Sequence, residues 1–160
     1  MLWNEDDLGM SLRYQASAAT AQSLNIAVMA LGVREPDDFD GAFAAMDREK
    51  PDAILMVSDS LTTLNRKRVF DYAMARRLPA LYEYDNIIHD GGLMSYGPDL
   101  GETMTRVAAM VDRIFKGTRP ADIPFETPTH YLFVLNLKVA KATGLDPPLT
   151  LLALADEVIE

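Results

Sequence analysis

Residues 51–85 read PDAILMVSDSLTTLNRKRVFDYAMARRLPALYEYD, and the fold class can be inferred from this segment. The apolar runs at residues 53–57 and 80–84 have the length of buried strands, and the segment 61–77 between them has the length of a helix. Pro79 can begin a strand but cannot continue a helix, so it separates the two elements. The order strand, helix, strand predicts a parallel pair of strands with the helix packed on one face.

The same alternation extends in both directions along the chain. Further strands are predicted at residues 1–3, 26–31, 93–96 and 131–135, and further helices at 10–24, 37–46, 99–116 and 136–143, before an apolar tail at 149–159. In the helix 37–46, apolar residues recur at the spacing of one helix face, which is typical of a helix packed against a sheet. The predicted fold class is therefore α/β, with a doubly wound parallel sheet.

The regular alternation breaks after Gly117. Three prolines between Thr118 and Thr129 predict an extended connecting segment instead of a helix or strand. The chain also opens inside a predicted strand, whereas whole domains usually bring a complete first strand. We therefore expect the sequence to be the later part of something longer.

The composition excludes several classes of protein. The 160 residues, 49% of them hydrophobic, suffice for one well-cored domain or two small lobes. A net charge of −9 repels phosphate backbones, so no nucleic-acid partner is expected. The apolar runs are far shorter than the roughly 20 residues of a membrane helix, and the acidic start Met1–Asp7 does not resemble a secretory signal. Without cysteine there is no disulfide, thiolate metal site or cysteine nucleophile.

Polar clusters follow the predicted strands. They are Asn4–Asp7, Ser58–Ser60, Glu83–Asn86 and Ser95–Pro98. Ligands of open parallel sheets bind at the carboxyl ends of the strands, where these donors and acceptors could orient an amino or carboxylate group. Each cluster can equally serve only to cap the following helix. The two histidines lack the spacing of a metal site and no nucleotide motif is present, so no metal or cofactor is predicted.

Asp59, at the end of a strand, also allows an alternative function. A receiver-like phosphoacceptor signalling domain would use Asp59 as its acceptor, beside carboxylates that hold Mg²⁺. Such chemistry needs a hydroxyl residue after the fourth strand and a lysine after the fifth. The corresponding positions, Glu83–Asp85 and Tyr96–Pro98, contain neither a serine or threonine hydroxyl nor a lysine. A stand-alone flavodoxin-like protein with its own ligand pocket is a further possibility.

Four motifs carry a resemblance to a known family. They are RLPALYEY at 77–84, GGLMSYGP at 91–98, IFKGTRPADIP at 114–124 and NLKVAKATGL at 136–145. In this order they resemble the substrate-binding proteins of ATP-binding-cassette importers, in particular the tryptophan and aromatic-acid type. The resemblance implies a type I periplasmic-binding fold of two lobes that closes over a small solute, an amino acid or an aromatic or small carboxylate. It further implies delivery to a membrane permease without catalysis, in the periplasm or anchored outside the cell.

The resemblance covers only the C-terminal portion of such a protein. It implies a second-lobe α/β core at residues 1–85, a segment at 86–117 that crosses to an incomplete first lobe, and a return segment with a final strand and helix at 118–160. The ligand contacts that it implies are Asn4, Ser58, Asp59, Ser60, Ser95, Tyr96 and Gly97. Ser60 stands where the group often has an amide, which leaves the class of ligand open.

An incomplete first lobe has a physical consequence. The apolar stripe from Leu100 to Phe115 and the strand 93–96 would lose part of their packing partner and expose an apolar patch and a sheet edge. We therefore expect a homodimer, formed through this surface or by exchange of the segment 86–117 between copies. A half-site should also bind solute weakly, because closure of two lobes normally buries most of the ligand.

Overall fold

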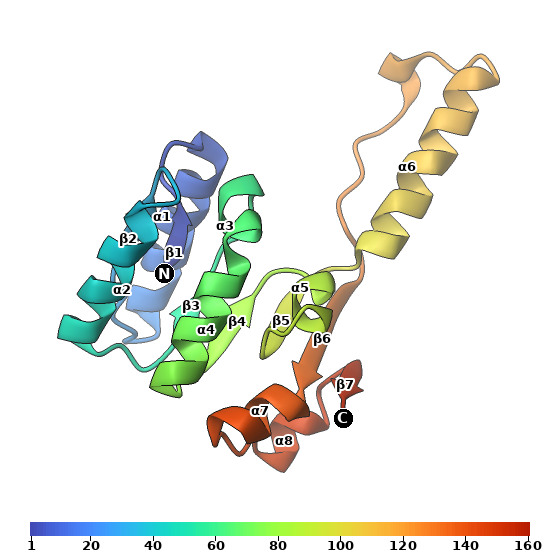
Figure 1. Ribbon diagram of the computed structural model, residues 1–160. Helices are drawn as coiled ribbons and strands as arrows, with labels where there is room; N and C mark the ends of the chain where they lie inside the picture. The colour runs from blue at the N-terminus through green and yellow to red at the C-terminus, as the bar shows by residue number, and fades with distance from the viewer.

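The computed structural model describes residues 1–160 as strands alternating with helices (Figure 1). The strands are β1 Leu2–Asn4, β2 Leu31–Val33, β3 Ile54–Leu55, β4 Ala80–Tyr82, β5 Met94–Pro98, β6 Tyr131–Asn136 and β7 Glu157–Ile159. The α-helices are α1 Leu8–Ser23, α2 Asp38–Glu49, α3 Ser60–Leu64, α4 Arg66–Arg76, α5 Asp85–His89, α6 Leu100–Phe115, α7 Leu137–Thr143 and α8 Leu149–Leu152. A 3-10 turn, η1, covers Pro120–Asp122. No helix combines the length and apolar character that a membrane span requires.

The strands form two sheets that are linked edge to edge. One sheet pairs β1 with β2, and the other has the order β3-β4-β5-β6-β7. A bridge between Leu2 and Met56 joins them, and the backbone N–H of Val57 donates to the carbonyl of Leu2 at 3.0 Å. All pairs are parallel except β5 with β6, which are antiparallel. The predicted α/β class with a mainly parallel sheet is confirmed.

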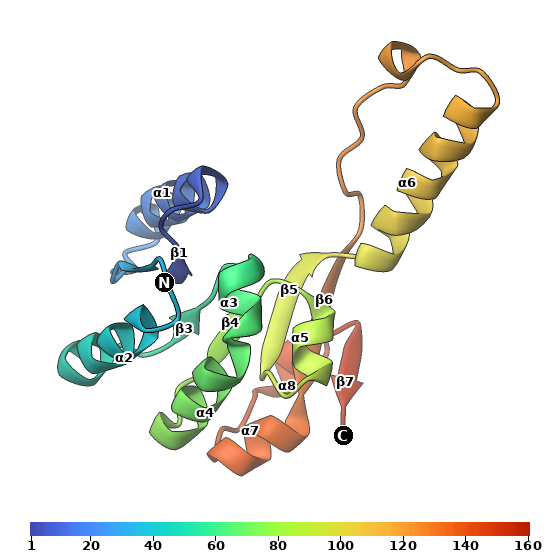
Figure 2. The same ribbon diagram turned by 45° about the horizontal axis from the view of Figure 1, so that its top comes forward.

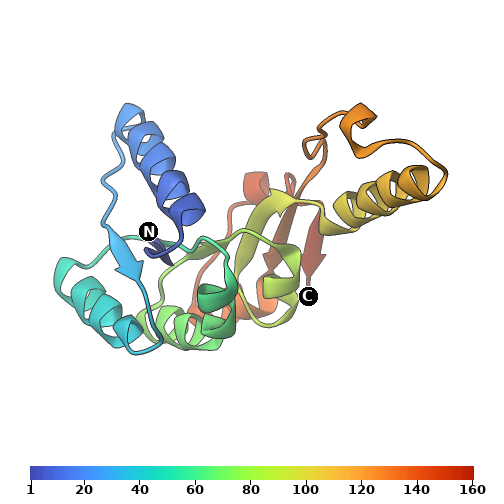
Figure 3. The same ribbon diagram turned by 90° about the horizontal axis from the view of Figure 1, so that it is seen from above.

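The main core lies on one face of the sheet. Cross-strand partners on this face include Ile54, Ala80 and Val134, which belong to a cluster of 15 buried hydrophobic residues. Helices α2, α4 and α5 contribute to the same cluster, with Phe39 of α2 fully buried. Figure 3 shows α2 and α4 on one side of the sheet and α1 on the other. The predicted apolar face of the helix at 37–46 is thus the face that α2 turns to the sheet.

Several predicted boundaries differ from the structure. The helix predicted at 61–77 is two helices, because the Asn65 side chain donates to the carbonyl of Leu61 at 2.9 Å and its backbone leaves helical geometry. The strand predicted at 26–31 begins only at Leu31, where the chain first pairs with β1. The sequence pattern also did not predict α5 or β7, because elements this short show no recurring spacing of apolar residues.

Residues 99–130 leave the sheet at the end of β5 and return at the start of β6, and we call them the arm. Its helix, α6, buries no residue and projects away from the sheet (Figures 1 and 2). By contrast, α5 packs in the main body, where Ile87 and Ile88 are buried. The chain therefore departs from the sheet after Pro98, and the crossing of residues 86–117 to another lobe stays a prediction.

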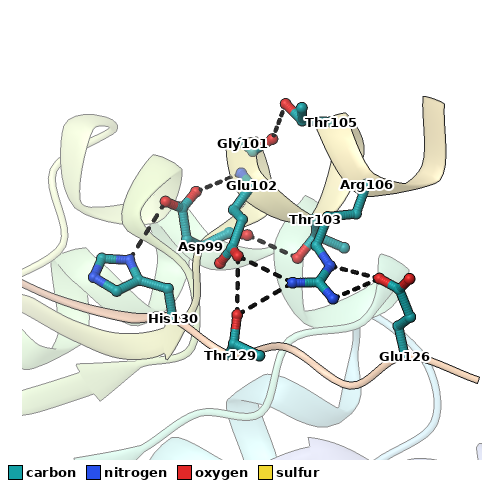
Figure 4. A network of polar contacts seen from close by, with 9 residues as sticks. All are labelled: Asp99, Gly101, Glu102, Thr103, Thr105, Arg106, Glu126, Thr129 and His130. Carbon is teal, nitrogen blue, oxygen red and sulfur yellow. Dashed lines mark hydrogen bonds and ion pairs between the residues drawn. The ribbon is translucent and has the colours of Figure 1, made fainter. Parts of the chain in front are cut away.

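A polar network fixes the base of the arm (Figure 4). Asp99 caps α6 by accepting from the backbone N–H of Glu102 at 3.0 Å. Arg106 forms an ion pair with Glu126 at 2.6 Å, and the Thr129 hydroxyl donates to Glu102 at 2.9 Å. These contacts tie the first turns of α6 to the returning segment of the arm before β6, so the arm has a defined direction.

Candidate functional site

The carboxyl ends of β1 and β3 meet through a side-chain hydrogen bond. The Asn4 amide Nδ2 donates to Asp59 Oδ2 at 2.6 Å, across 55 positions of sequence. Asn4 is the last residue of β1 and Asp59 lies four residues after β3, and parallel strands bring their carboxyl ends to one edge of the sheet. The structure therefore joins two of the polar clusters that the sequence places far apart.

Asp59 also caps the helix that follows it. Asp59 Oδ1 accepts from the backbone N–H of Thr62 at 2.9 Å, and the Thr62 hydroxyl accepts from the backbone N–H of Asp59 at 3.0 Å. This reciprocal capping box starts α3, with exposed Ser60 as its first residue. Burial opposes ionisation of Asp59, but the hydrogen bonds from Thr62 and Asn4 outweigh it and lower its pKa. Asp59 is thus an ionised carboxylate at the sheet edge.

Glu83, directly after β4, connects a third strand end to the cluster. Its carboxylate accepts from Arg13 Nη1 at 2.6 Å and from the backbone N–H of Ser58 at 3.2 Å. The Glu83 side chain is 16% exposed, so the ion pair is partly shielded from water. Burial alone would lower the pKa of Arg13, but Glu83 outweighs it and the pKa is raised. Burial also raises the pKa of neighbouring Tyr84, and the Glu83 carboxylate raises it further.

Gly97 allows β5 to approach the end of β4. A Cβ atom at this position would overlap the carbonyl oxygen of Glu83 and lie 2.9 Å from its carbonyl carbon. Since the obstacle is backbone, a side chain could not be accommodated by a change of rotamer. The absence of a side chain at Gly97 therefore sets the position of the Glu83 backbone, whether or not Gly97 contacts a ligand.

Ser95 and Tyr96 do not join this cluster. Ser95 is fully buried on the core face beside Tyr82 and Val134, and its hydroxyl has no hydrogen-bond partner. A solute does not reach it in this conformation. Tyr96 lies on the opposite face, 59% exposed, where it stacks with Tyr131 at a ring distance of 5.8 Å. Successive residues of a strand point to opposite faces, so the side chains of these two lie on opposite faces of the sheet.

The predicted residues that the structure does gather are Asn4, Ser58, Asp59, Ser60 and Gly97. Ser58 is 7% exposed, and its hydroxyl has no partner. The sequence placed Glu83 in a polar strand-end cluster but not among the ligand contacts. Nothing in the sequence pattern indicated that Arg13 belongs to the site. An arginine on a helix normally points into solvent, and its partner Glu83 is 70 positions away.

The receiver-like alternative is not favoured by this geometry. Both carboxylate oxygens of Asp59 accept hydrogen bonds from its own helix or from Asn4. No three histidine, aspartate or glutamate side chains form a group that could hold a metal ion. A phosphoacceptor aspartate needs such a group beside it to bind Mg²⁺.

Replacing Asp59 with alanine removes the cap of α3 and is expected to lower the free energy of unfolding by about 1 kcal/mol. The pKa of Asp59 is lower than its ordinary value of 3.8, so its ionised form contributes stability above that pH, and this contribution is lost as the pH falls below it. The difference between wild type and variant should therefore shrink in acid. Denaturant titrations at about pH 7 and about pH 3 measure both effects. Asp59→Asn is the control, since asparagine caps equally well; an equal loss at pH 7 in this control would contradict the capping role.

Comparison with known proteins gives one family and several similar folds. Residues 11–159 match the family model described as ABC transporter substrate binding protein. No curated protein sequence matches the chain.

Three solved structures share the fold. The ABC domain in complex with L-Trp from Streptococcus pneumonia has a TM-score of 0.87 at 22% identity, over 99% of this chain and 53% of that one. A conserved domain protein from Vibrio cholerae gives 0.88 at 19% identity, over 98% and 53%. The ligand-free, open form of a substrate binding protein with adhesive properties from Clostridium difficile gives 0.74 at 16% identity, over 99% and 52%. The chain thus spans about half the length of these proteins.

Proposed function

The chain belongs to the ABC transporter substrate binding protein family, and from that premise we propose that it binds a small organic solute for an import system. The observation that carries this proposal is the joining of three strand ends into one polar edge, through the bonds of Asn4 to Asp59 and of Glu83 to Ser58. This is the edge at which open parallel sheets bind ligands. The residues here form one wall of a site, so the affinity of the isolated chain should be modest.

The charge of the edge favours a solute that carries an amino group. Asp59 and Glu83 contribute two carboxylates, and Arg13 neutralises only one of them. The remaining negative charge would attract an ammonium group, whereas a free carboxylate has no unpaired cation to meet. The similar structure from Streptococcus pneumonia holds an amino acid, L-Trp, which fits this charge. We propose an amino acid, bound with its ammonium group toward Asp59 and Glu83.

The solute is proposed to leave the site unaltered. Neither histidine lies at this edge: His89 is paired with Glu157, and His130 with Asp99 at the base of the arm. The chain has no cysteine to act as a nucleophile. Delivery to a membrane permease, from the periplasm or from an anchored position outside the cell, belongs to the same proposal and follows from the family.

Calorimetric titration with matched probes tests whether a solute binds and which of its charged groups the site recognises. L-tryptophan carries both charged groups, tryptamine lacks the carboxylate and indole-3-propionate lacks the amine. We expect L-tryptophan or another amino acid to bind, and the amine-free acid to bind at least about tenfold more weakly than its amino-acid counterpart. Equal binding of the amine-free acid would contradict the ammonium assignment. An absence of binding for every probe and for a panel of amino acids at millimolar concentration would contradict the proposed function.

The variant Glu83→Gln keeps the shape of the side chain and removes its charge. It should weaken binding of the amino acid by roughly tenfold, because a charged hydrogen bond becomes a neutral one. Glu157→Gln is the matched control, since Glu157 is exposed and pairs only with His89. A loss of the same size in the control would attribute the effect to net charge and not to the site.

A further inference from the structure

Arg13 is joined to Glu83 by a single hydrogen bond. Its Nη1 donates to Glu83 Oε1 at 2.6 Å, while the second carboxylate oxygen, Oε2, accepts from the backbone N–H of Ser58. The pair is therefore not the two-bonded fork that arginine and a carboxylate often form. A guanidinium group carries five N–H donors, and those on Nε and Nη2 are not engaged by Glu83. The Arg13 side chain is also 48% exposed, so these donors are available to a solute.

The packing of α1 fixes the position of Arg13. The next residue, Tyr14, stacks on Trp3 of β1 with the ring centres 4.0 Å apart, and the Trp3 indole N–H donates to the Ser11 hydroxyl at 3.3 Å. These contacts determine which side of α1 faces the end of β1. From there Arg13 reaches Glu83, directly after β4. A cation is thus held at the same edge as the polar strand ends.

Two carboxylates lie near this cation. Glu83 is its direct partner, and Asp59 directly follows Ser58, whose N–H binds Glu83. An α-amino acid carries its ammonium and carboxylate groups on the same carbon atom, so the protein groups that bind them must lie close together. Neighbouring groups of opposite charge meet this condition, because each forms a charge-assisted hydrogen bond with one end of the solute.

We propose that Arg13 binds the α-carboxylate of the amino acid through the N–H groups that Glu83 does not engage, while Asp59 and Glu83 bind its ammonium group. This inference rests on the proposed function and adds the residue that distinguishes an amino acid from the corresponding amine. A solute with a carboxylate alone would still meet the net negative charge of the edge. Arg13 therefore favours a molecule that carries both groups.

Two simpler roles for Arg13 lead to different expectations. If Arg13 only held Glu83 in place, its loss would weaken the binding of an amino acid and of its amine alike, because both carry the ammonium group. If Arg13 only offset negative charge, its loss would strengthen binding of the amine and leave the amino acid, which has no net charge, nearly unaffected. Only a contact with the carboxylate weakens the amino acid without weakening the amine.

Calorimetric titration of the 160-residue chain with matched pairs of probes tests the proposal. The pairs are L-tryptophan with tryptamine, L-tyrosine with tyramine and L-leucine with 3-methylbutylamine, and the members of each differ only by the carboxylate. In wild type, the amino acid of a pair should bind at least about tenfold more tightly than its amine. Arg13→Gln should weaken the amino acid by about tenfold and leave the amine no weaker, which abolishes the preference.

Two further variants serve as controls. Arg48→Gln removes the same charge from the last turn of α2, where Arg48 is exposed and forms no ion pair, and should leave the preference unchanged. Arg13→Lys keeps the charge and should restore part of the preference, because a lysine ammonium still binds a carboxylate but lacks the planar fork. Circular dichroism of each variant should match that of wild type.

The Nε–H signal of Arg13 in NMR spectra, identified by its loss in Arg13→Gln, reports the contact itself. The amino acid should shift this signal more than the paired amine does. Equal shifts, or equal weakening of amino acid and amine by Arg13→Gln, would overturn the inference and leave the proposed function in place. Absence of binding to wild type by every probe and by the wider panel of amino acids would contradict the proposed function, and the inference with it.

Discussion

Alanine in place of Gly97 is expected to destabilise the protein by about 3 kcal/mol, the upper end for overpacking a well-packed site. The added Cβ would overlap the carbonyl oxygen of Glu83, so β4 and β5 would have to separate at the edge where the site lies. Glu83 would move with its backbone and lose its geometry toward Arg13 and Ser58. The loss in the free energy of solute binding should therefore exceed the loss in the free energy of unfolding. Denaturant titration and calorimetry on the same preparation measure the two effects.

Gly41→Ala is the matched control for this experiment. Gly41 lies inside α2, and a Cβ there would meet no atom within 4 Å. Because alanine favours a helix over glycine, this variant should gain roughly 0.5–1 kcal/mol, the opposite sign. A Gly97→Ala variant as stable as wild type would show that β5 does not need its close approach to Glu83.

Alanine in place of Phe39 is expected to lower the free energy of unfolding by about 3–5 kcal/mol, the usual cost of emptying a buried phenylalanine site. Phe39 is fully buried between α2 and the sheet, beside Phe43 at a ring distance of 6.2 Å. The Arg68 guanidinium lies 5.4 Å from its ring centre, a cation–π contact that would also be lost.

Phe125 supplies the control, because its side chain is fully exposed on the arm. Phe125→Ala should change the unfolding free energy by no more than about 0.5 kcal/mol. Urea titrations of both variants measure the difference. A cost below about 1 kcal/mol for Phe39→Ala would mean that α2 is not part of the main core.

The sequence predicted the parts of the fold that rest on local pattern. The alternation of strands and helices, the cap at Asp59 and the buried side of α2 all follow from spacings of a few residues. The break at Asn65 escaped prediction because a helix of the right length and composition gives no sign that one side chain will compete for its backbone.

The site was only partly predictable for a different reason. That polar strand ends meet is a property of parallel sheets, and Asn4 and Asp59 followed from it. Which face a strand residue takes depends on register, so the sequence alone does not show that consecutive Ser95 and Tyr96, both expected near the ligand, turn to opposite faces of the sheet. The hydrogen bond of Arg13 to Glu83 depends on where α1 packs against the sheet, and the spacing of nearby residues does not predict that placement.

We expect a small solute to bind at the shared edge of β1, β3 and β4. Assigned amide NMR spectra of the chain, recorded during titration with an amino acid that binds, locate the binding site. The shift changes should cluster at Asn4, Ser58–Ser60, Glu83 and Gly97 and saturate with the solute. Shift changes confined to the arm or to α2, or unaltered spectra with every amino acid at millimolar concentration, would contradict it.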